Sequence, residues 1–396
     1  MMKKLKDFDF ILMITPILLS AFGIVMIYSA SMVMAVVEGF EPTHYLYRQL
    51  LWFLIGLAGF IACSIFPYQN YQKLMKFIVL TMVFLLVGVL FFGEVRGNAR
   101  SWFVFGPISF QPSEITKLGL VMYLASVYSK KQEYIHDFYK GVLPPLVLTG
   151  IILSLIMMEP DIGTTAIIFL IASTVVISSG IRRKHLLVLA FVTLLLIAFT
   201  IPKMVTDVRI SRFTGAYQPF EAPDDSGYHL IQSYLAIGGG GVTGEGLGQS
   251  VQKLGYLFGA HTDFIMSVIS EELGFFGVAL VIGMLSLIVL RGLFIARKCE
   301  DSFGSLLAIG ISSMIGIQSF INIGAISGIL PITGVTLPFV SYGGSSLFVT
   351  LIAMGVLNNI AMTAKKNDGQ APMRTDVPES PNIQRFNQRG GKRWSS

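Results

Sequence analysis

Long apolar runs dominate this sequence and restrict the class of protein that it can form. Only 13% of its 396 residues are charged and the mean hydropathy is +0.69, whereas about a quarter of the residues in a soluble domain are charged. A membrane-spanning helix needs about 20 consecutive apolar residues. Ten runs approach or exceed this length, at residues 10–37, 47–66, 74–93, 112–129, 142–158, 163–181, 185–202, 264–296, 303–326 and 336–362. The sequence therefore predicts an all-α polytopic membrane protein with about ten transmembrane helices.

The distribution of basic residues predicts how these helices are oriented. If the N-terminus lies inside the cell, 21 of the 29 Lys and Arg residues fall in cytoplasmic segments, as the positive-inside rule requires. Both termini are then cytoplasmic, and a large loop, residues 203–263, lies outside the cell between helices 7 and 8. The net charge of +6 follows from this topology, so it does not indicate nucleic-acid binding.

The composition divides the chain into two regions. Residues 1–362 are expected to form the transmembrane domain, with the outer loop as its extracellular part. The first apolar run is longer than the 7–15 residues of a signal-peptide core, so it is expected to remain as a membrane anchor. Residues 363–396 are polar, basic and without periodicity, which predicts a disordered cytoplasmic tail.

The outer loop is the first candidate for a functional site, because ordered loops of this length usually have a function. It contains Arg209, Arg212 and Lys253, a glycine-rich part, and Asp263 at the start of the next apolar run. A formal GxGxxG match in it lacks the βαβ context of a nucleotide site. Asp263 has two interpretations. It could cap the next helix, because negative charge is favoured at a helix N-terminus, or it could be a catalytic carboxylate. The residues alone leave both open.

Charged and irregular segments at membrane depth give a second set of candidates. Glu114 and Lys117 are three residues apart at the start of the fourth run, so they share one helix face. Charges within a bilayer face partners or water-filled cavities, and this pair could be a structural ion pair, part of a site, or both. Residues 331–346 are rich in proline and glycine, which predicts irregular backbone that is buried in protein or lines a cavity.

Six motifs in order along the chain resemble the SEDS family (shape, elongation, division and sporulation), and the resemblance covers almost the whole chain. They are IYSAS at Ile27–Ser31, QPSEITK, EPDIGTT, AIGGGGVTGEGLGQS, TDF with EELG at Glu271–Gly274, and LPFVSYGGSS at Leu337–Ser346. The SVQKLGYL stretch before AHTDF is most similar to the cell-division branch of the family. One departure is clear: Phe258 and Gly259 stand where the family usually has Pro-Glu.

The resemblance implies a peptidoglycan glycosyltransferase that polymerises lipid II on the outer face of the cytoplasmic membrane, at the division septum. It implies that Asp263 is the acidic residue that carries out catalysis, as the base that removes a proton from the acceptor hydroxyl. The substrate-binding residues expected from it, and from the basic residues on the outer side, are Arg48, Glu114, Lys117, Arg209, Arg212, Ser250, Lys253 and Ser341. A divalent cation, Mg²⁺ or Mn²⁺, is implied as a possible cofactor, although no set of metal ligands can be read from the sequence.

The implied partners are lipid II, a single-pass class B penicillin-binding transpeptidase and other divisome proteins. We expect the transpeptidase to dock on the eighth and ninth helices, with crosslinks along residues 280–325, because Gly324 and Gly328 form a pair of small residues that allows close helix approach. Three alternatives stay open at this stage. The chain could be a lipid II flippase without covalent chemistry, a scaffold that recruits the transpeptidase, or an elongation or sporulation paralogue of the same polymerase.

Overall fold

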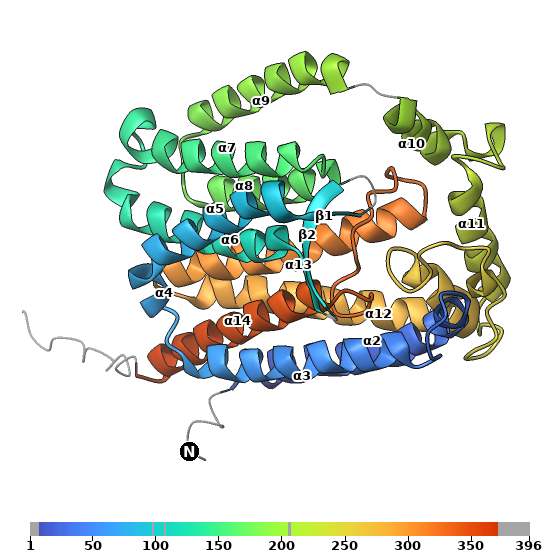
Figure 1. The fold of residues 1–396 in the computed structure, drawn as a ribbon. Helices are drawn as coiled ribbons and strands as arrows, with labels where there is room; N and C mark the ends of the chain where they lie inside the picture. Colours follow the sequence, from blue (N-terminus) through green and yellow to red (C-terminus); the bar gives the residue numbers. More distant parts are fainter. Residues whose placement is uncertain (1–7, 97–98, 107, 205–206, 371–396) are drawn as a thin grey trace, which may run out of the picture.

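The computed structural model describes residues 8–96, 99–106, 108–204 and 207–370. In this part of the chain, each of the ten predicted runs becomes a long helix (Figure 1). These are α2 (Phe10–Val37), α3 (His44–Ile65), α5 (Met75–Phe92), α6 (Pro112–Lys130), α7 (Leu143–Met158), α8 (Ile162–Ser178), α9 (Arg183–Met204), α12 (Ile265–Lys298), α13 (Ser302–Ile326) and α14 (Gly344–Gln370). Seven described helices are long and apolar enough to cross a membrane by length and composition alone. The predicted class of all-helical polytopic membrane protein is confirmed.

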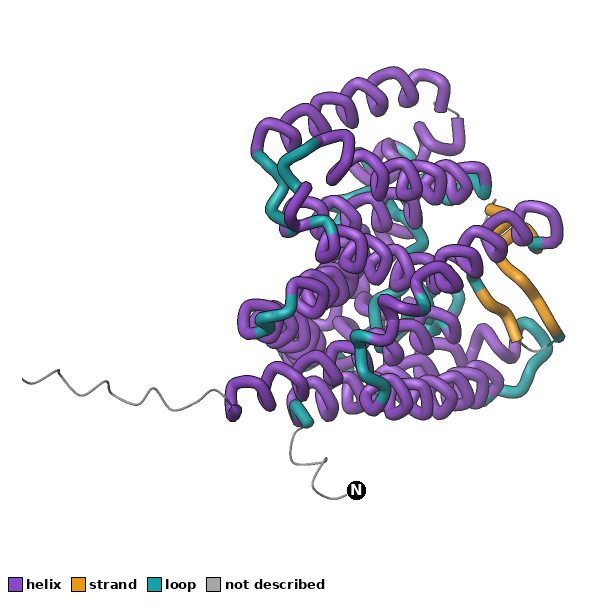
Figure 2. Tube along the Cα trace, turned by 90° about the vertical axis from the view of Figure 1, so that its left-hand side faces the viewer, coloured by secondary structure: helices purple, strands orange, loops and turns teal. Residues whose placement is uncertain are grey.

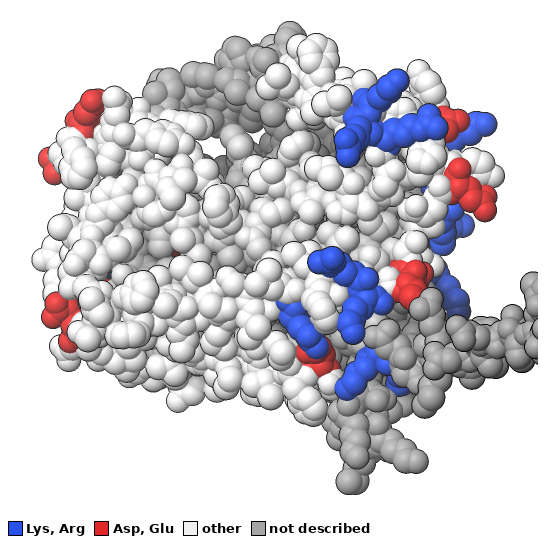
Figure 3. Space-filling view, turned by 180° about the vertical axis from the view of Figure 1, so that it is seen from behind, with Lys and Arg blue, Asp and Glu red and all other residues white. Residues whose placement is uncertain are grey.

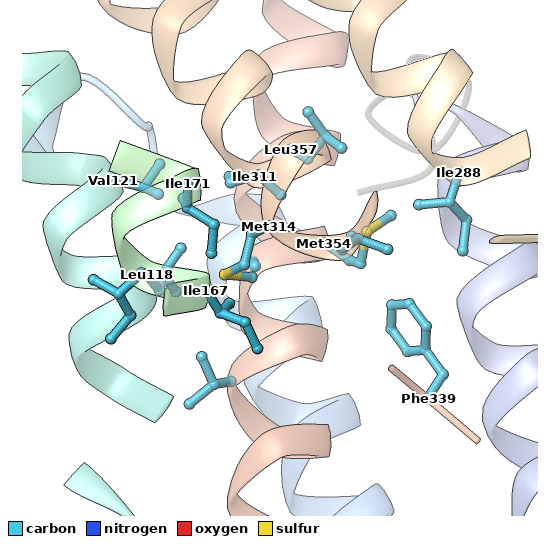
Figure 4. Close-up of a cluster of buried hydrophobic side chains, with 14 of the residues drawn as sticks. Leu118, Val121, Ile167, Ile171, Ile288, Ile311, Met314, Phe339, Met354 and Leu357 are labelled. Carbon is cyan, nitrogen blue, oxygen red and sulfur yellow. The ribbon is translucent and has the colours of Figure 1, made fainter. Parts of the chain in front are cut away.

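The core lies where α6, α8, α12, α13 and α14 meet. Leu118, Ile171, Ile311, Met354 and Leu357 are among the side chains that fill it, and none is more than 7% exposed (Figure 4). The outer helices, in contrast, expose large apolar side chains, such as Phe84 on α5 at 74%. This inversion is expected where the surroundings of a helix bundle are lipid rather than water.

The sequence analysis did not predict a small sheet that the structure contains. Strands β1 (Glu94–Arg96), β2 (Ala99–Phe105) and β3 (Ile108–Phe110) pair antiparallel in that order and lie at the edge of the helical bundle (Figure 2). They fill the connection between α5 and α6. A hydrogen-bonded meander satisfies the backbone of this connection without a further helix.

The two ends of the bundle differ in charge. In Figure 3, Lys and Arg side chains gather at one end of the visible face, and acidic side chains lie at the opposite end. The basic end is where the chain's two described ends meet, because the Asp9 amide donates to Asn358 Oδ1 over 3.1 Å. The positive-inside rule assigns this end to the cytoplasm, so the other end is the outer end.

Two helices allow depth to be measured from the inner end. The Arg291 guanidinium of α12 donates to Asp9 Oδ2 beside the start of α2, over 2.7 Å. At 1.5 Å per residue, α2 rises about 30 Å from Asp9 to Ser29, and the regular part of α12 from Arg291 to Phe275 rises about 24 Å, with Glu272 just beyond it. Ser29 and Glu272 are hydrogen-bonded over 2.7 Å, so the two measurements agree. Measured from the Asp9–Arg291 pair, this contact is therefore about one hydrocarbon thickness, about 30 Å, towards the outer end.

Two predicted boundaries change. The loop predicted at 203–263 contains α10 (Asp207–Tyr217) and α11 (Tyr228–Gly240), so much of it is helical. The last predicted run begins at residue 336, but α14 begins only at Gly344 and continues to Gln370, into the predicted tail. Residues 371–396 of that tail lie outside the described residues. Before α14, the irregular segment packs on α2, where a Cβ on Gly23 would lie 2.7 Å from the Phe339 carbonyl oxygen.

Candidate active site

Asp263 lies in the turn that leads into α12, at the outer end of the bundle. The residue is half-buried, and burial raises the pKa of its carboxyl group to about 6. Among the described residues, no hydrogen bond to this carboxylate is found. A Cβ built on Gly334 would lie 3.6 Å from Asp263 Oδ2, so the irregular segment before α14 forms one wall beside the carboxylate.

The sequence left open whether Asp263 is a helix cap. In the structure the N-cap of α12 is Phe264, and no side-chain cap hydrogen bond is found at this helix end. The Asp263 carboxylate is therefore not used as a cap in this conformation. It remains available for other chemistry.

Two amide side chains on α13 connect the site to its walls. Asn322 Nδ2 donates to the Asp263 carbonyl oxygen over 2.9 Å and to the Val335 carbonyl oxygen over 2.7 Å. One helical turn away, Gln318 Nε2 donates to the Thr336 carbonyl oxygen over 3.0 Å. The sequence analysis did not assign these two amides to the site. Amide side chains within an otherwise apolar helix were the available signal, because polar groups at membrane depth need partners.

Lys117 and Glu114 form the predicted pair and connect directly to Gln318. Lys117 Nζ lies 2.8 Å from Glu114 Oε2 and donates to Gln318 Oε1 over 2.8 Å. Lys117 and Glu114 are only 3% and 8% exposed. The pair on α6 is therefore joined to the Asp263 segment through α13. The ammonium group of Lys117 thus has two partners within the protein.

The glycine-rich segment, residues 238–255, packs against α12 and is called the brace below. Gly274 interrupts this helix with φ of 63°, a conformation that glycine adopts at low cost. The carbonyl oxygens of Glu271 and Glu272 instead accept hydrogen bonds from the amides of Glu245 and Gly246, over 2.9 and 3.0 Å, respectively. No side chain fits at Gly244, where a Cβ would lie 2.2 Å from the Glu272 carbonyl oxygen.

Lys253 and Ser250, both predicted to bind substrate, are buried within this brace. Lys253 is 3% exposed, and its ammonium group donates to Glu272 Oε1 over 2.6 Å and to Ser29 Oγ over 3.0 Å. Ser250 is 2% exposed and hydrogen-bonds to Glu271. The structure therefore places both residues in contacts within the protein.

The remaining predicted residues lie in three places. Ser341 is next to the site, because its hydroxyl donates to the Thr262 carbonyl oxygen over 2.6 Å. Arg48 is half-buried in the first turns of α3, next to Gln49, whose Oε1 accepts from the Gly343 amide over 3.3 Å. Arg209 and Arg212 belong to α10, but their side chains lie outside the described residues.

A buried carboxyl group that the sequence analysis did not assign to the site lies at the outer turn between α7 and α8. Glu159 is 0% exposed, its two carboxyl oxygens have no hydrogen-bond partner within the described ranges, and burial raises its pKa to about 8. Next to it, the Asp161 side chain caps α8 and accepts from Gln111 over 3.3 Å. This turn contacts the Asp263 wall, because a Cβ on Gly163 would lie 2.8 Å from the Thr333 carbonyl oxygen.

Comparison with known proteins identifies the family. The family model of the cell cycle proteins FtsW, RodA and SpoVE matches residues 9–366. The chain belongs to this family. It is 50% identical over 387 residues to "Probable peptidoglycan glycosyltransferase FtsW" of Bacillus subtilis (strain 168), covering 95% of this chain and 96% of that protein. It is 40% identical to "Stage V sporulation protein E" of the same organism, covering 89% and 96%.

Solved structures of this family have the same fold. A chain in "Structural coordination of polymerization and crosslinking by a peptidoglycan synthase complex" superposes with a TM-score of 0.75 at 29% identity, covering 90% of this chain and 98% of that one. The rod shape determining protein RodA of Thermus thermophilus superposes with a TM-score of 0.64 at 27% identity, covering 89% and 96%. The predicted resemblance to the family is confirmed.

The departure from the family pattern at Phe258–Gly259 has a local structural consequence. Gly259 has φ of 73°, and its carbonyl oxygen accepts from the amides of Thr262 and Phe264 over 3.0 and 3.2 Å. A glutamate in this left-handed conformation would be strained. The turn that presents Asp263 in this chain is therefore built around a glycine.

Proposed function

We propose that this protein is a peptidoglycan glycosyltransferase that polymerises lipid II at the outer membrane surface, with Asp263 as its general base. The observation that supports this most directly is the Asp263 carboxylate itself. It is half-buried at the outer end, has no described hydrogen-bond partner and has a pKa of about 6. A base with a pKa near the working pH is efficient and accepts protons readily.

The proposed reaction forms one glycosidic bond and breaks one bond to phosphate. The hydroxyl oxygen of the acceptor sugar attacks the anomeric carbon of the donor sugar. Asp263 takes the hydroxyl proton, and the bond between the anomeric carbon and the lipid pyrophosphate breaks with its electron pair going to the phosphate oxygen. General base catalysis of this kind typically contributes a factor of about 10²–10⁴ to the rate.

The leaving pyrophosphate requires positive charge nearby, because electrostatic stabilisation acts where charge develops. We propose that Arg48, Arg209 and Arg212 supply it, because they are basic residues on the outer side of the chain. Lys253 is held by Glu272 and Lys117 by Glu114. The bidentate geometry of arginine suits phosphate oxygens. Lys117 then contributes through its field from within the protein.

A divalent cation fits this site as part of the substrate complex. No group of three His, Cys, Asp or Glu side chains that could hold a metal ion is found among the described residues. Mg²⁺ is commonly held by one or two carboxylates together with substrate phosphates. We propose that Mg²⁺ or Mn²⁺ enters with the pyrophosphate, whose negative charge it would neutralise.

The division branch is the best-supported role within the family. The relative named FtsW is 50% identical to this chain, and the relative named as a stage V sporulation protein is 40% identical. We therefore propose that the protein acts at the division septum. A fluorescent fusion should gather at midcell in growing cells, and a signal confined to the side wall or to developing spores would contradict this assignment.

We further propose that the transmembrane helix of a single-pass transpeptidase docks between α12 and α13. A groove of about 310 Å³ lies there, lined by nine residues that include Leu285, Val289, Gly316 and Phe320. The related solved chain is part of a peptidoglycan synthase complex that couples polymerisation with crosslinking. The predicted range of residues 280–325 contains this groove.

The pair Gly324 and Gly328, which suggested the docking of a partner helix, is not open to one. A Cβ on Gly324 would lie 2.9 Å from Leu330 Cδ1, and one on Gly328 would lie 2.0 Å from the Tyr234 hydroxyl oxygen. Both glycines are therefore covered by side chains of this protein. Gly316, which lines the groove, has only Val289 within 4 Å of such a Cβ and is the small residue that a partner helix could approach.

The proposed function is tested with Asp263→Asn. The neutral amide cannot accept the proton, so polymerisation by purified protein with lipid II should fall at least about a hundredfold. Lipid II binding and thermal stability should stay near those of the unchanged protein, because the carboxylate makes no described hydrogen bond. Near-normal polymerisation by this variant would remove Asp263 as the base. Translocation of lipid II without polymer, by the unchanged protein, would indicate a flippase instead.

A further inference from the structure

A cluster of aromatic and imidazole rings lies beside the Asp263 turn and has no role in the reaction described so far. It combines Phe40 of the α2–α3 connection and the first turn of α3 with His261 and Tyr342 of the site. The Phe40 and His44 rings stack with centroids 4.2 Å apart, and the Tyr45 ring lies 4.7 Å from His261 and 5.0 Å from Tyr342. The Tyr45 hydroxyl also hydrogen-bonds to Glu38.

The position of this cluster excludes hydrocarbon as its surroundings. Ser29 lies about 30 Å from Asp9 along α2, about one hydrocarbon thickness towards the outer end. The helix continues to Val37, which adds about 12 Å at the same rise. The rings of the α2–α3 connection therefore lie at the level of the lipid headgroups or beyond, where a soluble ligand group can reach them.

The cluster is connected to the catalytic turn by the backbone. The Tyr342 amide donates to the His261 carbonyl oxygen over 2.9 Å, and the next residue's carbonyl, that of Thr262, is held by Ser341. Asp263 follows directly. The His261 ring and the Asp263 carboxylate therefore belong to one short turn, whose backbone is held by Ser341 and Tyr342.

The cluster offers both apolar ring faces and hydrogen-bonding groups. Phe40 is 48% exposed, which offers an apolar ring face stacked on an imidazole. Glu38 is exposed, and burial lowers the pKa of His261 to about 4, so its imidazole is neutral near pH 7. A neutral imidazole has one hydrogen-bond donor and one acceptor. Apolar ring faces with a few polar groups are typical of small-molecule sites.

We propose that Phe40, His44, Tyr45, His261 and Tyr342 form a shelf that binds a pyranose ring of the lipid-linked substrate next to Asp263. This inference rests on the proposed function and names the part of the protein that recognises the sugar. A pyranose has C–H groups on its faces and hydroxyl groups around its rim. The aromatic faces can pack against the C–H groups of the sugar. Glu38 and the His261 imidazole can form hydrogen bonds with its hydroxyl groups. Phe40 and His44 form the open part of the shelf, whereas Tyr45 and Tyr342 orient His261.

The test separates recognition of the sugar from recognition of the lipid pyrophosphate. Binding is measured in the Asp263→Asn background, so that no turnover occurs, with lipid II and with undecaprenyl pyrophosphate, which lacks the sugars. Phe40→Ala combined with His44→Ala should weaken lipid II binding about tenfold and change undecaprenyl pyrophosphate binding less than twofold. Phe92→Ala is the matched control, because Phe92 is an 82% exposed aromatic residue at the outer end of α5, and it should change neither.

Two further results decide the proposal. Tyr45→Phe keeps the ring and removes the hydroxyl that bonds to Glu38, so it should weaken lipid II binding less than Phe40→Ala does, at unchanged thermal stability. Equal losses for both ligands, or no loss for lipid II, would overturn the shelf. If the unchanged protein binds lipid II through the shelf but makes no polymer, the proposed polymerase activity is wrong while the shelf remains.

Discussion

The side-chain amide of Asn322 holds the backbone of Asp263. Its Nδ2 donates to the Asp263 carbonyl oxygen over 2.9 Å and, with its second hydrogen, to Val335 over 2.7 Å. Asn322 is 2% exposed and belongs to α13, in the core of the bundle. The Asp263 turn and the irregular wall beside it are thus fixed to one rigid helix, which is how a site on loops keeps its geometry.

Asn322→Asp should reduce catalysis more than binding. The side chain keeps its size, but an ionised carboxylate cannot donate to the two carbonyl oxygens, and buried acceptors without a partner cost about 1–3 kcal/mol each. We expect kcat for lipid II polymerisation to fall at least about tenfold, since a misplaced base loses proximity. Lipid II affinity should change less than about threefold.

Ser319→Ala is the control for Asn322, because the Ser319 hydroxyl donates only within α13, to Ile315 over 2.8 Å. It should leave polymerisation unchanged. If Asn322→Asp raises KM and leaves kcat intact, Asn322 does not position the base.

The acid side of the pH profile should report Asp263. With a pKa of about 6 in the substrate-free protein, the ionised fraction falls from most of the molecules at pH 7 to about one tenth at pH 5, so kcat/KM should fall about tenfold over this range. The effect on stability has the opposite sign. The folded protein binds the Asp263 proton more tightly than the unfolded chain does, so the protonated group contributes stability that is fully present below the ordinary pKa of 3.8. This contribution is lost as the pH rises through about 6.

Thermal unfolding measured across the same pH range separates the two effects. A loss of activity at pH 5 with unchanged folded fraction agrees with titration of the base. A profile that stays flat down to pH 4 in fully folded protein would mean that the base has a much lower pKa than the structure indicates.

The sequence predicted the ten helices well because membrane spans are encoded in run length, which is read directly from composition. It also placed Glu114 and Lys117 together, because three-residue spacing fixes a shared helix face. The β1–β3 meander was missed, since its strands are short and belong to a connection. Short strands carry too little periodicity to be distinguished from a loop.

The site was harder to predict, because its contacts join residues far apart in the chain. Lys253 was assigned to substrate from its charge, yet its partners Glu272 and Ser29 come from two other helices. Asn322 and His261 were not assigned, because their roles depend on which backbone segments fold against them. A single sequence gives the helix on which such a residue lies but not what it touches.

Glu114 and Lys117 should behave as one unit. Breaking a buried pair leaves an uncompensated charge and costs about 3–5 kcal/mol. Glu114→Gln and Lys117→Met should therefore each lower the thermal unfolding temperature and the polymerisation rate, and the double variant should lose less than the sum. Lys76→Met, at an exposed lysine of α5, is the control and should lower neither. Strictly additive losses would show that the two residues act separately.

Lys253 should prove structural rather than substrate-binding. Lys253→Met leaves the fully buried Glu272 carboxylate without its cation, so stability should fall by about 3–5 kcal/mol. The KM of the remaining folded protein should stay within about twofold of normal. Adding Glu272→Gln should recover part of the stability. Glu245→Gln, an exposed change in the same segment, should have no effect. A higher KM at normal stability would return Lys253 to the substrate site.

Crosslinking should locate the partner helix in the groove between α12 and α13. Cysteines placed at Val289, Leu290 and Phe320, which line the groove, should form crosslinks with cysteines in the transmembrane helix of the transpeptidase. Both native cysteines, Cys63 and Cys299, should first be replaced by serine. A cysteine at Phe84 of α5, a lipid-exposed position outside the groove, should stay uncrosslinked.

Enlarging Gly316 should weaken the same complex. Gly316→Leu fills the groove where a Cβ has only Val289 nearby, at 3.5 Å, so the protein can fold while the partner helix loses its closest approach. We expect copurification of the transpeptidase to fall at least about fivefold at unchanged thermal stability. Gly283→Leu, on α12 with open space around its Cβ and outside the groove lining, should leave the complex intact. Crosslinks that form only at other helices, with Gly316→Leu harmless, would place the partner elsewhere on the bundle.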